Sequence, residues 1–234
     1  MKLRTYIVDQ VRKMPFGKPF DFGYIDYPKS KSSNVAVILH DLKVAGELES
    51  LGKGVFYRPE VSQYGLGKLP VYQEALFEYV QKKYNAHIAG PYIYSRINIT
   101  EQVAVVITLA TPVPERPISF GMYNFVFEKC DIGYVEEDKL LVAYLDALKN
   151  VEKIPGCTPY KAFARIKRGI SNLDASEKDR LCTYALSYPS RVKVSLAAAL
   201  EAEEDASRKE RLLSEVHPST IISMKNKTYL YETA

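Results

Sequence analysis

Two segments near the amino terminus carry apolar residues at the spacing of one helix face. Residues 3–14 follow the i, i+3, i+4 rule and predict a short amphipathic helix. A second helix is predicted within KSKSSNVAVILHDLKVAG, where Ser32 and Ser33 are natural N-cap residues and Gly46 suits the position just past the carboxyl end. Its apolar stripe consists of Val35, Ile38, Leu39 and Leu42.

The next segment, ELESLGKGVFYRP, has two short apolar stretches around the turn Gly52-Lys53-Gly54, which predicts a hairpin. With a short aromatic segment at 20–27 between the helices, residues 1–62 therefore follow the order helix, short element, helix, hairpin. That order is typical of a winged helix-turn-helix, in which the later helix enters the major groove and the hairpin lies on the backbone.

The remaining pattern predicts a linker at 61–70 and a second, mixed domain over 70–234. Continuous apolar or aromatic runs predict a small sheet from strands 103–109 and 118–127. Helical periodicity is found at 69–84, 91–102, 137–149, 159–172, 176–186 and 191–215. Ser176 with Asp179 resembles a capping box for one of these helices. The predicted fold class is α+β: an amino-terminal winged helix-turn-helix, then a mixed α/β domain with a small sheet and a helical carboxyl-terminal part.

The charge balance adds a constraint on partners. The 234 residues carry a net charge of +4 and 47% hydrophobic residues, which is ordinary for a globular chain. Residues 1–60 hold ten Lys/Arg against seven Asp/Glu, residues 61–155 hold nine against eleven, and residues 156–234 hold thirteen against ten. The positive charge is therefore divided between the two ends, and neither end has the strong excess of a dedicated nucleic-acid binder.

The sequence also indicates a compartment. Its opening residues contain no apolar signal core, and no apolar run approaches the ~18 residues of a membrane span. Three widely spaced cysteines suit reduced thiols. We therefore expect a cytoplasmic protein without a membrane partner.

Sequence motifs for catalysis or cofactors are not found. The three histidines and three cysteines show no metal-ligand spacing, and no phosphate-binding glycine loop or nucleophile elbow occurs. Glu137-Asp138-Lys139 matches the acid-x-Lys end of a nuclease-like motif. A helix start explains these residues better, because acidic side chains are favourable at the positive, amino-terminal end of the helix dipole. We expect no cofactor, no metal and no enzymatic activity. The remaining alternative is an enzyme whose motif is not recognisable in the sequence.

If the second helix is a recognition helix, its outward positions meet bases and the lysines around it meet phosphates. Asn34 suits an adenine edge, and Ser33 suits either a cap or a phosphate. His40 fits a solvated helix face as well as it fits a contact. The candidate DNA-binding residues are Lys29, Lys31, Ser32, Ser33, Asn34, Val37, His40, Lys53 and Arg58.

A second set of basic residues lies toward the carboxyl end and shares helical spacing in its first part. It could face DNA backbone, an acidic partner or water, and these readings stay open. The set consists of Lys161, Arg165, Lys167, Arg168, Arg191 and Lys193.

Several segments together resemble a known family. SSNVAVILHDLKVAGEL followed by LGKGVFYRP resembles the winged helix-turn-helix of AbiEi-type antitoxins of type IV toxin–antitoxin systems. The middle, YIYSRINITEQVAVVITLATPVPERPISFGMYNFVFEKC, is similar to the second domain of that family, and SYPSRVKVSLAAAL and LLSEVHPSTIISM are similar to its closing helices. The resemblance covers about residues 5–225.

The resemblance implies a transcriptional repressor that binds double-stranded operator DNA of its own operon, as two copies, and counters a nucleotidyltransferase toxin. Two departures stand out. Glu47 and Glu49 flank Leu48 where the family commonly has basic residues, and Ala197-Ala198-Ala199 replaces a common glycine. Because each lost phosphate contact weakens DNA binding, the acidic wing favours an alternative: a protein-interaction module or plain regulator with weak or lost DNA binding.

Overall fold

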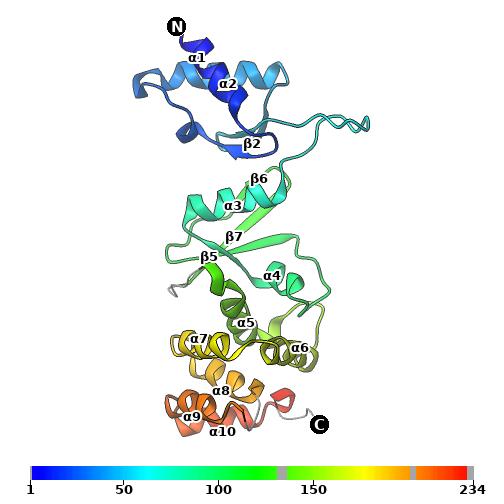
Figure 1. Cartoon of the computed structure of the whole chain (residues 1–234), viewed down its shortest axis with the longest axis vertical. Helices are drawn as coiled ribbons and strands as arrows, with labels where there is room; N and C mark the ends of the chain where they lie inside the picture. Colours follow the sequence, from blue (N-terminus) through cyan, green and yellow to red (C-terminus); the bar gives the residue numbers. More distant parts are fainter. Residues whose placement is uncertain (1, 131–135, 201–203, 231–234) are drawn as a thin grey trace. The chain divides into compact units, whose positions relative to one another are not determined.

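The computed structural model describes residues 2–130, 136–200 and 204–230, and it shows a mixed α+β chain (Figure 1). The described residues form ten α-helices and two small sheets, with strand orders β1-β3-β2 and β4-β5-β7-β6. They fall into two compact units: residues 1–87 with 115–126, and residues 88–114 with 127–234. Residues 70–87 and 115–126, which we expected in the second domain, group with unit 1.

Unit 1 begins with α1 (Leu3–Lys13), followed by the short strand β1 (Pro19–Phe20) and α2 (Ser32–Val44). The predicted apolar stripe of α2 is confirmed, since all four of its residues are buried in one core with Ile7 and Val11 of α1. Gly46 has φ +76°, and the amide of Glu47 donates to the carbonyl of Leu42 at 2.9 Å, which is the Schellman arrangement expected of a C′ glycine.

The predicted hairpin is also confirmed. Strands β2 (Glu49–Gly52) and β3 (Val55–Tyr57) are antiparallel, and β1 pairs with the other edge of β3. Gly52 pairs with Val55, so Lys53 and Gly54 form a two-residue turn in which both have positive φ. Such a turn matches the twist of the strands it joins.

The rest of unit 1 consists of a loop at 59–72, α3 (Gln73–Tyr84), β6 (Ile118–Phe120) and most of β7 (Tyr123–Lys129). The segment predicted as a linker folds back on itself, with the amide of Ser62 donating to the carbonyl of Gly67 at 2.8 Å. Helix α3 starts four residues later than predicted, and Tyr72, the residue just before it, is 42% exposed. The aromatic side chain of Phe77 on α3 packs edge-on against Tyr123 and Phe125 of β7.

Unit 2 begins within β4 (His87–Ala89), whose last two residues belong to this unit. Helix α4 (Gly90–Arg96) and strand β5 (Val106–Thr111) follow. The remaining helices follow in sequence and enclose a single apolar core centred on Leu145, Phe163, Ile166 and Leu196. They are α5 (Lys139–Lys149), α6 (Pro159–Ser171), α7 (Ala175–Ala185), α8 (Ser190–Ala199), α9 (Ala206–Ser214) and α10 (Pro218–Lys225).

Several predicted elements are wrong in detail. The run 118–127 is two strands, because Gly121, with φ +59°, and Met122 form a turn between them. The strand predicted at 103–109 is shifted to β5, and Val103 and Val105 are exposed. The helix predicted over 191–215 ends at Ala199, since Leu200 is extended, and a new helix begins at Ala206; residues 201–203 lie outside the described part.

Two predicted caps are wrong as well. Ser32 and Ser33 are not N-caps: they are the first two residues of α2, which starts directly from a 3₁₀ turn at Lys29–Lys31, and no side chain caps it. The capping box of α7 is formed by Asp174 and Glu177, two residues before the predicted pair, and Ser176 instead accepts a hydrogen bond from Arg180 at 2.9 Å.

No helix in the described ranges is both long enough and apolar enough to span a membrane. The three cysteines are unbonded to one another, and Cys182 is buried, where desolvation raises its thiol pKa to about 11.

Candidate nucleic-acid interface

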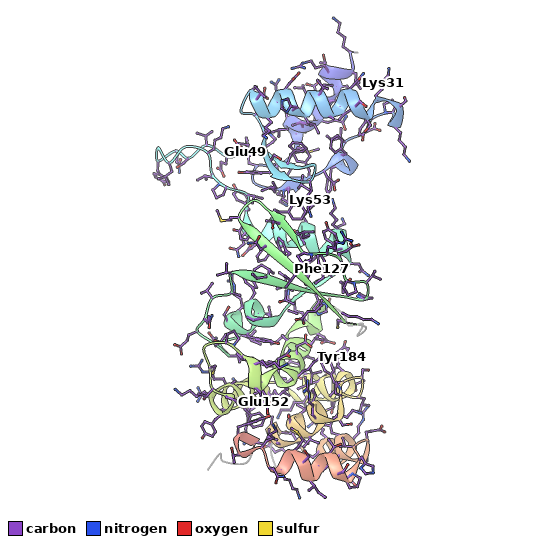
Figure 2. All side chains as sticks on the ribbon, turned by 180° about the vertical axis from the view of Figure 1, so that it is seen from behind. Lys31, Glu49, Lys53, Phe127, Glu152 and Tyr184 are labelled. Carbon is purple, nitrogen blue, oxygen red and sulfur yellow. The ribbon has the colours of Figure 1, made fainter. Side chains whose placement is uncertain are left out.

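The amino-terminal end of α2 gathers five of the predicted DNA-binding residues. Lys29 and Lys31 lie in the 3₁₀ turn before the helix, and Lys31 is labelled there in Figure 2. Ser32, Ser33 and Asn34 follow in the first helical turn, and all five side chains are exposed. Among the described residues, neither lysine makes an ion pair and neither serine hydroxyl caps the helix. This end therefore presents two free ammonium groups and three small polar side chains to solvent.

The outward face of α2 continues the same surface. Val37 is 60% exposed and His40 is exposed, as expected for positions opposite the buried stripe. Asp41, the acid on this face, accepts from Arg4 of α1 at 2.6 Å. The pair cancels a negative charge that would otherwise oppose a phosphate.

Lys53 occupies the tip of the β2–β3 hairpin and is exposed (Figure 2). Its φ of +51° lies in the left-handed region, where a lysine is uncommon and Asn or Gly is favoured. The hairpin is braced from the side, because the amide of Gly121 donates to the carbonyl of Leu51 at 3.0 Å. Lys53 is therefore held in place on a supported turn.

The two acids that weaken the case for DNA binding are both paired. Arg12 of α1 donates two hydrogen bonds to Glu47, at 3.0 and 3.1 Å, which together with its charge lower the pKa of that carboxyl. Lys68 contacts Glu49 at 2.8 Å. No local sequence pattern indicates Arg12 or Lys68, since each lies far along the chain from its partner. Consequently the acids of the hairpin do not present uncompensated charge.

Arg58 is engaged inside the unit. Its guanidinium donates to the carbonyls of Arg12 and Met14, at the end of α1, and lies 4.2 Å from the centre of the Phe16 ring. These contacts use the carbonyls that the end of a helix leaves without intrahelical partners. Arg58 therefore joins the end of α1 to the segment that follows the hairpin, and few of its N–H groups are left for a phosphate.

Replacing Arg58 with alanine should lower the free energy of unfolding of unit 1 by about 1–3 kcal/mol, because charge-assisted hydrogen bonds to two carbonyls are lost. Urea unfolding followed by circular dichroism measures the change. Arg58→Lys is the matched variant: it keeps the charge but not the planar fork, so it should recover only part of the loss. Full recovery by lysine would show that charge alone matters here.

The second set of basic residues does not form one surface. Arg165 of α6 donates to the carbonyl of Ile99 at 3.2 Å and to Glu101 at 2.6 Å. Lys161, Arg168 and Arg191 are exposed and Lys167 is partly exposed. Lys193 is a correction to the predicted face: it is only 8% exposed within α8, so it lies among the packed helices and not on their surface.

Comparisons with known proteins identify no family for this chain. No protein-family model matches the chain, and no curated protein sequence matches it. The chain is similar to the crystal structure of the RV2827C protein from Mycobacterium tuberculosis, with 12% sequence identity and a TM-score of 0.47 over 90% of this chain and 80% of that chain.

Proposed function

We propose that unit 1 is a winged helix-turn-helix that binds double-stranded operator DNA. Its α1, β1, α2 and β2–β3 hairpin follow the order of that module, with α2 in the place of the recognition helix and the hairpin as the wing. The short 3₁₀ turns at Phe22–Tyr24 and Lys29–Lys31 stand where the helix before the recognition helix is usual.

The observation that carries the proposal is the distribution of charge. Asp41, Glu47 and Glu49 are each paired with a basic side chain, whereas Lys29, Lys31 and Lys53 make no ion pair among the described residues. The unpaired charge is therefore positive at both places where the module would touch phosphates. The unfavourable φ of Lys53 also suggests that a charge at the wing tip is retained at a cost in turn stability.

In this proposal Lys29, Lys31 and Lys53 contact phosphates, and Ser33, Asn34, Val37 and His40 face the major groove. Three phosphate contacts give weak binding by one copy, so the functional complex is two copies on half-sites about 10 bp apart. Autorepression of the operon follows when such a site overlaps the promoter.

Fluorescence anisotropy with labelled duplexes tests the proposal. The duplex from upstream of the coding region should bind more tightly than a shuffled duplex, and log K should fall with log[salt]. Sedimentation of the complex should give two copies per duplex. No binding at about 50 mM salt would reject DNA binding and favour the alternative, a protein-interaction module.

We also propose, from the resemblance over residues 5–225, that the chain counters a nucleotidyltransferase toxin. The test is expression of the neighbouring open reading frame with and without this chain. Growth arrest by the neighbour, relieved by the chain, supports antagonism. A variant that has lost DNA binding separates the two activities: relief should persist if unit 2, residues 88–114 with 127–234, acts on the toxin or its products. No catalytic step is proposed for this chain.

A further inference from the structure

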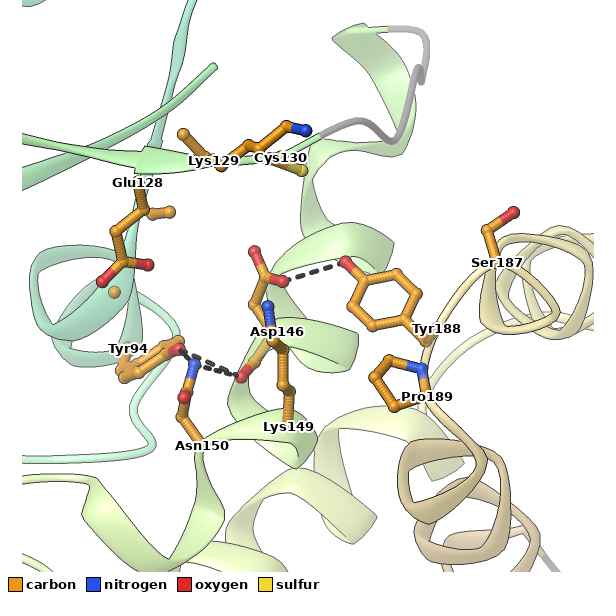
Figure 3. A pocket seen from close by; sticks show the side chains of 13 residues that line it. Tyr94, Glu128, Lys129, Cys130, Asp146, Lys149, Asn150, Ser187, Tyr188 and Pro189 are labelled. Atoms are coloured by element: carbon orange, nitrogen blue, oxygen red, sulfur yellow. Dashed lines mark hydrogen bonds between the residues drawn. The ribbon is translucent and has the colours of Figure 1, made fainter. Parts of the chain in front are cut away.

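Unit 2 contains a cavity of about 190 Å³ that the proposed function does not use (Figure 3). Five segments of the unit line it: the β4–α4 junction, β5, the end of β7, α5 and the loop between α7 and α8. Its charged lining consists of two acids, Glu128 and Asp146, and two lysines, Lys129 and Lys149. Its polar lining includes Tyr94, Cys130, Asn150, Ser187 and Tyr188. Residues of several segments thus converge on a space smaller than the roughly 300–1,000 Å³ of most ligand pockets, which limits an occupant to a very small molecule.

Asp146 is the fixed centre of this cavity. The hydroxyl of Tyr188 donates to one of its carboxylate oxygens, Oδ1, at 2.9 Å. The hydroxyl of Tyr94 and the amide of Asn150 both donate to its main-chain carbonyl, at 3.1 and 3.0 Å. Both tyrosines are buried, so their rings hold the aspartate in place. Within the described ranges, the other carboxylate oxygen, Oδ2, has no hydrogen bond or ion pair.

Oδ2 of Asp146 is therefore an unused acceptor of the cavity, and the two lysines that also line it, Lys129 and Lys149, are exposed residues. Both tyrosine hydroxyls already donate to Asp146, and neither of them reaches its second carboxylate oxygen. Figure 3 shows that oxygen directed away from Tyr188, toward the end of β7, where Lys129 and Cys130 lie. Burial raises the pKa of Asp146 to about 6, the Tyr188 hydrogen bond and the Lys149 charge lower it, and the Glu128 charge raises it. At neutral pH the carboxyl is ionised.

We propose that this cavity binds the ammonium group of a small organic amine, with Asp146 as its acceptor and Glu128 as a second carboxylate at the rim. A hydrogen-bond donor with positive charge complements the unpaired carboxylate oxygen, and the ring of Tyr188 adds a surface suited to a cation. A metal ion fits less well, because no group of three ligating side chains occurs in the described part of the chain. An anion would face the Asp146 carboxylate, whereas the two lysines of the lining, Lys129 and Lys149, are exposed residues.

The probe is 1,4-diaminobutane, compared with the neutral 1,4-butanediol of similar shape. Binding to the full chain is measured by saturation-transfer NMR at about pH 7.5, where Asp146 is ionised. The diamine should bind and the diol should not. Lowering the pH to about 5 should weaken binding about tenfold, because protonation of Asp146 removes the charge. Equal binding of the two probes, or no binding of the diamine at millimolar concentration, would overturn the proposal.

Three variants make the test specific. Asp146→Asn should weaken diamine binding at least about tenfold. Two substitutions at exposed positions should act in opposite directions: Glu128→Gln weakens binding about threefold and Lys149→Met, which removes a like charge, strengthens it about twofold. Tyr188→Phe keeps the carboxylate and should still bind. Unchanged binding in a folded Asp146→Asn protein, or the same direction of change in the two rim variants, would contradict the assignment.

Discussion

Replacing Asp205 with alanine should lower the free energy of unfolding of unit 2 by about 3–5 kcal/mol. Asp205 is 1% exposed and accepts from Arg208 at 2.6 Å and from Lys178 at 3.3 Å. Lys178 is itself almost fully buried. Removing the carboxylate leaves the buried Lys178 ammonium without its ion-pair partner, next to an Arg208 guanidinium that keeps Asp179 as an acidic partner. A buried charge left without compensation is the source of the large loss.

The measurement is urea unfolding of the full chain, followed by circular dichroism at wavelengths dominated by helix. Asp179→Ala is the matched control, because Asp179 contacts the same Arg208 guanidinium at 2.7 Å but its side chain is 63% exposed. An exposed partner should contribute less than about 1 kcal/mol. Equal losses from the two substitutions would show that burial of the ion pair does not determine its contribution.

The parts of the fold that sequence predicted well depend on local rules. The α2 stripe was predicted because helix periodicity places Val35, Ile38, Leu39 and Leu42 on one side, and burial of that side is what makes the helix stable. The hairpin and Gly46 were predicted because positive φ restricts which residues fit. In each case the decisive information lies within a few residues of the element.

The errors arose where a neighbouring element decided the outcome. Ser32 and Ser33 would cap α2 if the chain entered it from an extended conformation, but the 3₁₀ turn at Lys29–Lys31 leads directly into the helix. The run 118–127 has strand composition throughout, yet a turn at Gly121 divides it. Lys193 was included in the second basic set because it starts the following predicted helix and could extend the basic face if the fold brought it there. The packing of α8 instead buries it.

The candidate interface was predictable only in part. The positions of Lys31, Asn34 and Lys53 follow from the helix and hairpin assignments. The pairing of Glu47 with Arg12 and of Glu49 with Lys68 joins residues 35 and 19 positions apart, and no local pattern indicates it. The same holds for the cavity in unit 2, where Tyr94 and Tyr188 reach Asp146 from 52 and 42 positions away.

Combining Lys29→Glu, Lys31→Glu and Lys53→Glu should weaken binding to the operator duplex at least about 100-fold, because three phosphate contacts become repulsive. The dependence of log K on log[salt] should become shallower by about 3, since each lost contact removes nearly one released counterion. All three side chains are exposed, so the unfolding free energy should change by under about 0.5 kcal/mol.

Lys43→Glu is the control for this variant. Lys43 is exposed on the same helix but lies in the last turn of α2, at the opposite end from Lys29 and Lys31. Lys43→Glu changes the charge at one site as much as each substitution of the triple variant does, but it removes no proposed contact. The slope of log K against log[salt] should therefore stay the same. Affinity should fall severalfold at most, through weaker long-range attraction. The contrary result is a salt dependence of log K that becomes shallower with Lys43→Glu by as much as one lysine contributes in the triple variant. DNA would then follow the whole length of α2. The assignment of the amino-terminal end of α2 and the hairpin tip as the contact points would be wrong.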